Sequence, residues 1–466
     1  GKNIVSVVLQ CNNFEVINMG VMVPALEIIE EAKKHNADII GLSGLITPSL
    51  EEMSNVAREM ERDEWCRSKK IPLLIGGATT SKVHTAVKIA PHYSGPIIWI
   101  PDASRAVPVA QVLTSNENEK KLYIEKNESA YHALREKHSS KNSIEIISLE
   151  DARKNALKVD FSTKTPTPKV LGRRLLKNFP LEKLIQTIDW GPFFRSWDLA
   201  GKYPDILEDK IVGEQSKKLL VDANSMLNSI VSRKILTADA VFSILPARRT
   251  NNEDITIFSN ESLDHKIFTW HGLRQQTKKP RKQKNKCLAD FISHENDDRK
   301  DYLGLFFVTI NGTEQAAKNF EDSGDDYSSI MVKALADRLV ESFAEYLHML
   351  IRTEFWGYCP KESLNANDLI AESYQGIRPA PGYPSCPDHS IKEEMAKLLK
   401  VQEIGVSLTE NLAMSPASSI CGFYFWHPEA NYFNIGSIGN DQLGDYQRRV
   451  ELTEDNAKKR LVTVLS

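Results

Sequence analysis

The sequence predicts an α/β domain built on a doubly wound parallel sheet, followed by a larger α+β domain. Three observations support this prediction. Short apolar runs alternate with amphipathic helical stretches between residues 13 and 113, which is typical of a parallel sheet covered on both faces. The composition then shifts to Asn, Glu, Lys and Ser. Beyond residue 148, long helices and short strands occur without βα alternation, which favours an α+β domain.

The first region begins with an apolar run at residues 4–9, which is typical of a buried helix or strand. Strands and helices are then expected in alternation: an apolar run at 14–19, a helix at 23–34, a strand at 38–43, a helix after Pro48, a strand at 72–77, a helix at 85–90, a strand at 96–100 and a helix from Ser104. Ligands of such sheets bind at the carboxyl ends of the strands, so the loops 43–48, 76–81 and 102–105 are expected to share one rim.

These patterns divide the chain into three parts. Residues 1–114 are predicted to form the α/β domain, 115–147 a charged helical connector or linker, and 148–466 the α+β domain. The clearest helix of the last part covers 330–358, where apolar residues recur at spacings of three and four.

Composition and charge exclude several classes of protein. With 41% hydrophobic residues and a formal charge of -3, the 466-residue chain has no general attraction to nucleic acid or to an anionic membrane. No apolar run approaches the roughly 20 residues of a spanning helix and the start lacks the layout of a signal peptide, so a cytoplasmic protein is expected. The six scattered cysteines indicate neither a disulfide framework nor a zinc knuckle. The basic run 278–286 is interpreted as a solvated surface loop rather than a nucleic-acid patch.

Two loops of the predicted rim have a composition suited to ligand binding. The loop Ser43–Pro48 offers hydroxyls and backbone amides after a buried strand, although the same residues could simply cap the helix that follows Pro48. The pair Gly76-Gly77 lets a bulky ligand approach the backbone closely. A glycine pair alone is weak evidence.

Several segments resemble the cobalamin-dependent methionine synthase family. Four of them are similar to its cobalamin-binding domain: GKNIV (1–5), LQCNN (9–13), GLSGLITPS (41–49) and IGGATTSK (75–82). Four others are similar to its activation domain: DW (189–190), LAGKYP (199–204), DYSSIMVKAL (326–335) and GIRPAPGYP (376–384). The resemblance covers essentially the whole chain.

The resemblance implies a cobalamin site in the first domain. Ser43 and Thr47 are implied to hydrogen-bond the dimethylbenzimidazole tail, Gly76 and Gly77 to leave room for it, and Ala103 to line the same pocket. The family's cobalt-ligating histidine stands in an Asp-x-His-x-x-Gly motif whose last glycine aligns with Gly1. That histidine and the first strand of the sheet are therefore expected upstream of Gly1. His84 is expected to be a surface or supporting residue rather than a replacement ligand.

The resemblance also implies an S-adenosylmethionine site in the second domain. Arg378 is implied to hold the ligand's carboxylate from the rigid segment that includes Gly382 and Tyr383. Without the family, a pairing of Arg378 with a nearby carboxylate would be favoured. Asp189 is implied to bind the ligand's amino group, and a helix cap is its alternative.

Four further residues belong to the predicted sites of the second domain. Tyr432 aligns with an aromatic ligand contact that could face the sulfonium, and Phe433 follows it where some relatives have tyrosine. Asp337 and Glu341 lie one turn apart on the long helix and face the same side. They are either a solvated helix face or, as the family implies, a docking surface for the cobalamin domain.

The function implied by the resemblance is the reductive methylation of cob(II)alamin, with one electron from a flavoprotein and a methyl group from S-adenosylmethionine. This supports methyl transfer from methyltetrahydrofolate to homocysteine in methionine biosynthesis, on homocysteine and folate modules expected upstream, where zinc also binds. The protein's part is positioning, so no catalytic side chain is predicted. The alternative is a non-catalytic corrinoid carrier whose second domain only docks or regulates, and ligand binding by Arg378–Tyr383 and Asp189 discriminates between the two. A flavodoxin-like domain would fit the βα alternation but not the long second domain.

Overall fold

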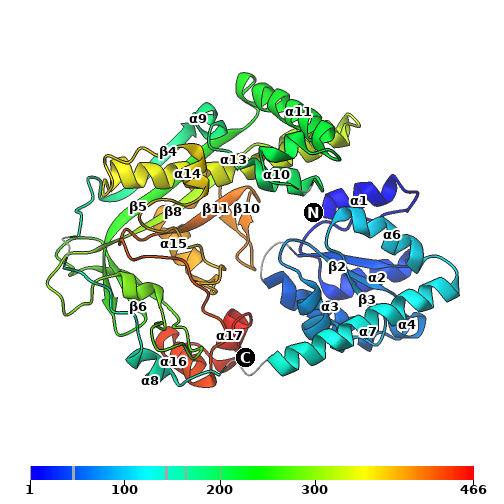
Figure 1. Cartoon of the computed structure of the whole chain (residues 1–466), viewed down its shortest axis with the longest axis horizontal. Helices are drawn as coiled ribbons and strands as arrows, with labels where there is room; N and C mark the ends of the chain where they lie inside the picture. Colours follow the sequence, from blue (N-terminus) through cyan, green and yellow to red (C-terminus); the bar gives the residue numbers. More distant parts are fainter. Residues whose placement is uncertain (1, 45–47, 142–144, 163–164, 200, 466) are drawn as a thin grey trace. The chain divides into compact units, whose positions relative to one another are not determined.

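The computed structural model describes residues 2–44, 48–141, 145–162, 165–199 and 201–465 (Figure 1). The chain divides into two units. The first unit comprises residues 1–144 together with 196–199, and the second comprises 145–195 together with 200–466.

The sheet of the first unit is parallel, as predicted. It holds β1 (Ile40–Ser43), β2 (Leu73–Gly76) and β3 (Ile97–Trp99) in the order β1-β2-β3. Ile40 lies opposite Leu73, which lies opposite Ile97. The apolar run at 14–19 forms no strand. Within the described ranges β1 pairs only with β2, so the run does not add to the other edge of β1.

Helices cover both faces of this sheet (Figure 1). They are α1 (Lys2–Gln10), α2 (Ala25–Lys34), α3 (Pro48–Arg62), α4 (Glu64–Lys69), α5 (Lys82–His84), α6 (Ala103–Leu113) and α7 (Glu117–Lys141), and a π-helical turn (Thr85–Ile89) and a 3-10 turn (Ala90–His92) extend α5. Leu73 and Ile75 of β2 pack with α2 and α3 on one face, while Leu74 packs with α6 on the other. The doubly wound class is therefore confirmed.

The segment 115–147, predicted as a charged helical connector or linker, contains the helix α7, which belongs to the first unit. In α7, the amide of Asn127 donates to the carbonyl of Ile97 at 3.0 Å, and the buried hydroxyl of Tyr131 accepts from the backbone N–H of Trp99 at 2.9 Å. The first unit therefore includes α7. Few apolar residues mark the face of this helix, so the sequence pattern does not indicate its packing on the sheet.

The second unit is built on a six-stranded antiparallel sheet in the order β11-β8-β5-β6-β7, with β4 paired to β5. Its strands are β4 (Gly172–Phe179), β5 (Thr237–Thr250), β6 (Asp254–Phe258), β7 (Lys266–His271), β8 (Tyr302–Asn311) and β11 (Ser419–Tyr424). The 14-residue β5 pairs with β8 along most of its length and with β6 near its end. A separate two-stranded ribbon is formed by β9 (Ser407–Leu408) and β10 (Met414–Ser415).

The long helix predicted at 330–358 is α13 (Asp326–Leu350), which a π-helical turn extends over Ile351–Phe355. The other helices are α8 (Leu149–Lys154), α9 (Leu181–Ile185), α10 (Trp190–Ser196), α11 (Gly213–Ser232), α12 (Thr313–Asp322), α14 (Ala366–Ile370), α15 (Ile391–Leu399), α16 (Asn440–Val450) and α17 (Glu454–Leu461), with 3-10 turns at Asp205–Glu208, Leu288–Phe291 and Val401–Ile404. Helix α13 contacts both β8 and β11, so the helix and its polar side chains lie next to the sheet. This confirms the α+β class.

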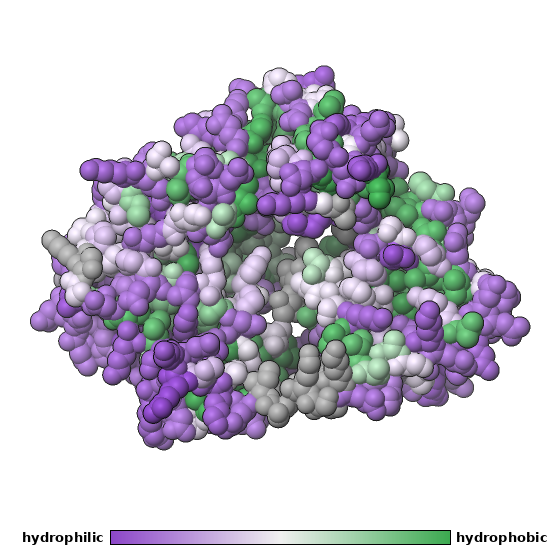
Figure 2. Space-filling view, in the orientation of Figure 1, coloured by the Kyte–Doolittle hydropathy of each residue, from purple (hydrophilic) through white to green (hydrophobic). Residues whose placement is uncertain are grey.

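The surface agrees with the composition. The face drawn in Figure 2 is mostly hydrophilic, with apolar residues in small groups. Residues 280–284 of the basic run are exposed, as a surface loop requires. No helix in the described parts of the chain is long and apolar enough to cross a membrane.

Gly77 is a position of the first unit where glycine is structurally required. Its φ is +104°, and a Cβ there would lie 2.2 Å from the carbonyl oxygen of Gly44. A Cβ at Gly76 would meet nothing closer than 3.5 Å, the distance to the carbonyl oxygen of Ile100. We expect Gly77→Ala to destabilise the first unit by about 2–3 kcal/mol and Gly76→Ala by less than about 1 kcal/mol. Hydrogen exchange of β2 in the full chain measures the difference, and equal protection in the two variants would contradict it.

Candidate ligand sites

The carboxyl ends of the parallel strands meet at one rim, as predicted. Ser43, the last residue of β1, is exposed, and the N–H of Gly44 donates to the carbonyl of Gly76 at 2.9 Å. Ala103 is buried at the start of α6, after the third strand. Thr47 lies outside the described residues. The structure therefore brings the first two predicted loops into direct contact.

Two threonines that the sequence argument did not single out also lie at this rim. The hydroxyl of Thr80 accepts from the indole N–H of Trp99 at 3.1 Å and donates to the carbonyl of Gly77 at 2.9 Å. The hydroxyl of Thr79 is buried, and no partner for it is found among the described residues. A buried polar atom without a partner is costly. The exposed hydroxyl of Ser43 and the unsatisfied one of Thr79 therefore fit a ligand that carries polar atoms.

His84 is half-buried on α5. Burial, with a smaller contribution from the charge of Lys88, lowers the pKa of His84, which favours the neutral imidazole. Its Nε2 is buried without a partner among the described side chains.

In the second unit, the segment around Arg378 lies against β11 and the residues that follow it. Ile377 pairs with Phe425, and the N–H of Phe423 donates to the carbonyl of Pro379 at 2.9 Å. Gly382 then turns the chain with a φ of +97°, and its N–H donates to the carbonyl of Cys386 at 2.7 Å. The rigid, turned segment predicted from the two prolines is present.

Arg378 forms an ion pair with a carboxylate that the sequence alone does not identify. Its Nη1 lies 2.7 Å from Oε2 of Glu345 on α13 and also donates to the hydroxyl of Tyr374. Burial alone would lower the pKa of Arg378, but the charge of Glu345 and the phenols of Tyr374 and Tyr432 outweigh it and raise that pKa. The pairing with a nearby carboxylate is therefore real in this structure. It occupies one guanidinium nitrogen.

Other predicted residues gather around this arginine. The hydroxyl of Tyr432 accepts from the backbone N–H of Arg378 at 3.0 Å. Oδ1 of Asp189 accepts from the N–H of Gly191 at 2.9 Å, so the helix-cap alternative is also realised. Partial burial raises the pKa of Glu341. The charges of Arg338 and Arg378 lower this pKa and that of Asp189 raises it, so these three charges lie within interaction range of Glu341.

Three predicted residues have distinct surroundings. Asp337 is exposed and accepts from the hydroxyl of Ser418 at 3.0 Å, and Glu341 is exposed one turn further along the same face. The side chain of Tyr383 is 63% exposed, and burial of part of it, with the charge of Glu341, raises its pKa.

Phe433 has a different environment from its neighbour Tyr432. Its ring packs against two groups of buried apolar residues of the second unit, one around Phe291 and Phe425 and the other around Ile435 and Tyr446, and its centroid lies 6.5 Å from that of Phe291. Tyr432 is 43% exposed. We therefore interpret Phe433 as a packing residue, whereas the sequence argument placed it among the ligand contacts.

A half-buried histidine, His389, and a buried lysine, Lys392, support the turn at Gly382. A Cβ at Gly382 would lie 2.0 Å from Cε1 of His389, so the imidazole fills the space that a larger residue would need. Nδ1 of His389 lies 2.8 Å from Nζ of Lys392, which is buried and also donates to the carbonyl of Leu412 at 3.1 Å. Burial, then the charge of Lys392, lowers the pKa of His389 to about 4, while Asp388 opposes this shift.

This depressed pKa makes the second unit sensitive to acid. In the unfolded chain His389 binds its proton near pH 6.5, so between there and about pH 4 only the unfolded state is protonated at this residue. Stability is therefore lost as pH falls through this window, by on the order of 3 kcal/mol from this group. We expect His389→Gln, which keeps an acceptor for Lys392, to show a shallower loss in urea denaturation. Parallel profiles for variant and wild type would contradict the assignment.

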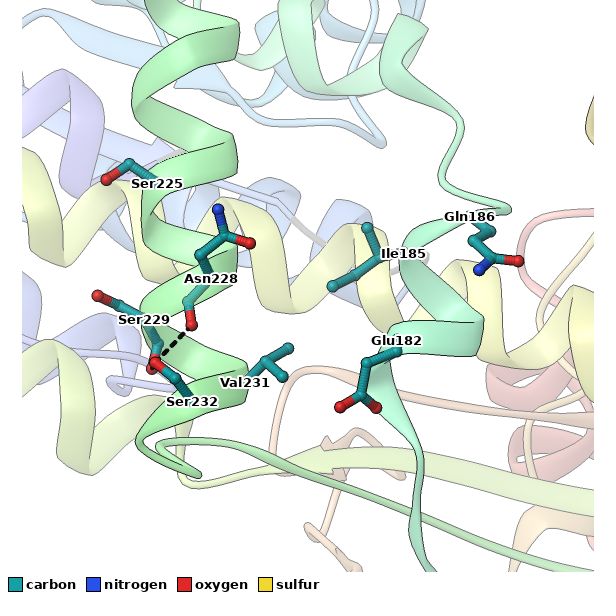
Figure 3. Close-up of a pocket in the computed structure, with 8 residues that line it drawn as sticks. All are labelled: Glu182, Ile185, Gln186, Ser225, Asn228, Ser229, Val231 and Ser232. Carbon is teal, nitrogen blue, oxygen red and sulfur yellow. Dashed lines mark hydrogen bonds between the residues drawn. The ribbon is translucent and has the colours of Figure 1, made fainter.

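A cavity of about 690 Å³ lies elsewhere in the second unit, between α9 and α11. Side chains of Glu182 and Ile185 from α9 and of Val231 from α11 point into this space (Figure 3). The residues predicted to bind ligand do not line it. The arginine-centred cluster is preferred as the candidate site because its charged groups converge there.

A parallel-sheet unit with a polar rim, followed by a unit with an arginine-centred site, defines a protein with two separate ligand-binding modules. Residues 1–90 match the family described as "B12 binding domain", and residues 180–451 match "Vitamin B12 dependent methionine synthase, activation domain". The chain belongs to the vitamin B12-dependent methionine synthase family, which is a family of methyltransferases. This confirms the resemblance found in the sequence.

A solved structure is similar to the chain over most of its length. It is described as "Crystal Structure of the MetH Reactivation Domain bound to AdoHcy" and is 43% identical, with a TM-score of 0.67. The match covers 69% of this chain and 99% of that one.

Proposed function

We propose that the second unit binds S-adenosylmethionine, and its demethylated product S-adenosylhomocysteine, in order to re-methylate cobalamin held by the first unit. The observation that carries this proposal is the side chain of Arg378, which is 18% exposed and fixed at Nη1, while Tyr432 accepts from the backbone N–H of the same residue. A guanidinium with a free edge suits a carboxylate. The similar reactivation domain that was solved with AdoHcy supports the choice of ligand.

Each residue of the site has a role in this proposal. Arg378 binds the ligand's carboxylate, Asp189 attracts its ammonium group, and the face of Tyr432 lies near its sulfonium. Tyr383, next to Gly382 in the turn, is sufficiently exposed to contact the ligand. Methyl transfer to a metal moves no proton, so the site needs no general base. Positioning and charge are what the chain supplies.

The first unit is proposed to hold the cofactor's tail. Ser43 and Thr79 would provide hydrogen bonds at the rim, Ala103 an apolar contact, and the glycine pair at 76–77 the close backbone approach. When bound, cobalamin supplies the cobalt to which a methyl group is transferred. A flavoprotein electron donor, homocysteine and folate modules, and a docking role for Asp337 and Glu341 belong to the same proposal.

Two titrations of the full chain test this function. S-adenosylhomocysteine is followed by calorimetry, and cobalamin by visible absorption, and binding of both is expected. Cobalamin binding without S-adenosylhomocysteine binding would favour the non-catalytic corrinoid carrier. Binding of neither ligand would contradict the proposal.

A further inference from the structure

Among the described residues, the guanidinium of Arg378 is held from one side. Nη1 contacts Glu345 and Tyr374, whereas the nearest carboxylate oxygen to Nη2, Oε1 of Glu372, is 3.9 Å away and too distant for a hydrogen bond. The backbone N–H of Arg378 is fixed separately by the hydroxyl of Tyr432. An incoming carboxylate can therefore bind at Nη2 while Glu345 still occupies Nη1.

Glu345 is a buried carboxylate that serves two arginines. Its side chain is 9% exposed, Oε2 contacts Arg378, and Oε1 lies 3.9 Å from Nη1 of Arg352. Tyr374 donates its hydroxyl to Oε2 at 3.1 Å. Oε1 itself is buried and accepts no hydrogen bond from the described residues. One oxygen of this carboxylate is therefore satisfied, and the other is left to hold a proton or a water molecule.

Arg352 is already paired with another carboxylate, Glu362, so Glu345 remains the partner of Arg378. The guanidinium of Arg352 is completely buried and already forms a two-point pair with Glu362, with Nε to Oε2 at 2.9 Å and Nη2 to Oε1 at 2.8 Å. Its Nη1 has no hydrogen-bond partner among the described residues. Positive and negative charges thus alternate along Arg378, Glu345, Arg352 and Glu362. With both glutamates ionised, the net charge of these four side chains is zero in the absence of ligand.

We propose that Glu345 is a positioning residue that shares Arg378 with the ligand's carboxylate and takes up a proton from solvent when that carboxylate binds. This inference rests on the proposed function. A second carboxylate on the same guanidinium places two negative charges close together in a region of low dielectric, which favours the protonated form of the buried one. The proton is assigned to Oε1, because Oε2 already accepts from Arg378 and Tyr374 whereas Oε1 accepts no hydrogen bond from the described residues.

The surroundings of Glu345 agree with this direction. Burial raises the pKa of Glu345, while the charges of Arg378 and Arg352 and the hydroxyl of Tyr374 lower it, and the net shift is upward. The titratable groups that face it or adjoin it are Arg378, Arg352, Glu372, Tyr374, Tyr424, Tyr432, His348 and Glu341. His348 is buried and its pKa is lowered by burial and by both arginines, so it stays neutral and does not compete for the proton.

The sign of the pH effect follows from this linkage. The complex binds one more proton than the free protein when the pH lies between the pKa of Glu345 without ligand and its higher pKa with ligand. Affinity therefore falls as pH rises through that window, by at most about tenfold per pH unit, and is constant outside it as far as this residue is concerned.

Calorimetric titration of the full chain with S-adenosylhomocysteine tests the inference. Repeating it at one pH in buffers of different ionisation enthalpy gives the number of protons taken up. We expect net uptake in the wild type, none in Glu345→Gln, and no uptake by the wild type with an analogue that lacks the carboxylate. Glu372→Gln is the matched control, because it removes an exposed carboxylate beside the same guanidinium and should keep the uptake.

The outcomes separate this inference from the proposed function. If S-adenosylhomocysteine does not bind, or binds equally well without Arg378, the proposed function fails. If it binds through Arg378 without proton uptake in the wild type, the inference about Glu345 alone is overturned. A Glu345→Gln protein that binds more weakly at every pH with an unchanged pH slope also overturns it. Should this variant not fold, the wild-type buffer series still decides.

Discussion

Replacing Arg378 by alanine should weaken the binding of S-adenosylhomocysteine to the full chain by about 2–4 kcal/mol, a loss of roughly 30-fold to 1000-fold in affinity. The guanidinium is the positive group of the site with a free hydrogen-bonding edge, and its side chain is only 18% exposed. Truncation would leave the ligand's carboxylate desolvated beside Glu345 without a counter-charge, so repulsion adds to the lost hydrogen bonds.

The same substitution also affects folding, and the two effects must be separated. Without Arg378, the nearest cation to Glu345 is Arg352, at 3.9 Å, so some loss of stability is expected. Arg378→Lys keeps the charge but not the planar fork, and should bind better than the alanine variant and worse than wild type. Arg173→Ala is the matched control, since it removes a partly buried pair with Glu403 and should leave affinity unchanged. Calorimetry on folded protein that gives wild-type affinity for Arg378→Ala would refute the site.

The local pattern of apolar residues was sufficient to predict the secondary structure in those segments where it is strongly periodic. The βα alternation predicted the three parallel strands, and apolar spacing predicted α13. At 115–147 the pattern predicted a helical connector or linker but not its attachment to the first unit, because Asn127 and Tyr131 of α7 bond backbone atoms of β3 through polar groups. Such bonds to a strand distant in sequence leave no hydrophobic period, so the pattern could not distinguish a connector from a helix of the domain.

Only part of the candidate site could be predicted from the sequence, for a similar reason. Asp337 and Glu341 were recognised as one helix face, and Glu345 continues the same spacing of four. Its burial depends on a segment some 30 residues away in the chain, around Tyr374 and Arg378, which the periodicity of α13 cannot reveal. The need for glycine at Gly77 was likewise assigned to a ligand, whereas close approach to the Gly44 backbone is sufficient to explain it.

Replacing Arg274 by methionine should reduce the free energy of unfolding of the second unit by about 3–5 kcal/mol. The side chain is 1% exposed, and its guanidinium contacts Glu253 at 2.8 Å and both oxygens of Asp290 at 2.8 and 2.9 Å. Two of its nitrogens also donate to the carbonyls of Asn285 and Asn252, at 2.8 and 3.1 Å. Methionine fills similar space but provides no donor, so two carboxylates and two carbonyls lose a partner at once.

The loss should not exceed this range, because each carboxylate keeps a second partner. Arg153 remains 2.7 Å from Glu253, and Arg249 remains 3.3 Å from Asp290, so neither buried charge is left completely unpaired. Lys278→Met is the control: it removes an ion pair with Glu145 in which both side chains are about 60% exposed, and should change stability by less than about 0.5 kcal/mol. Urea denaturation of the full chain, with hydrogen exchange in β6 to identify the second unit, measures both variants. If Arg274→Met proved as stable as the control, the buried pairs would contribute little, and the apolar packing around β6 and β7 would have to hold this end of the sheet.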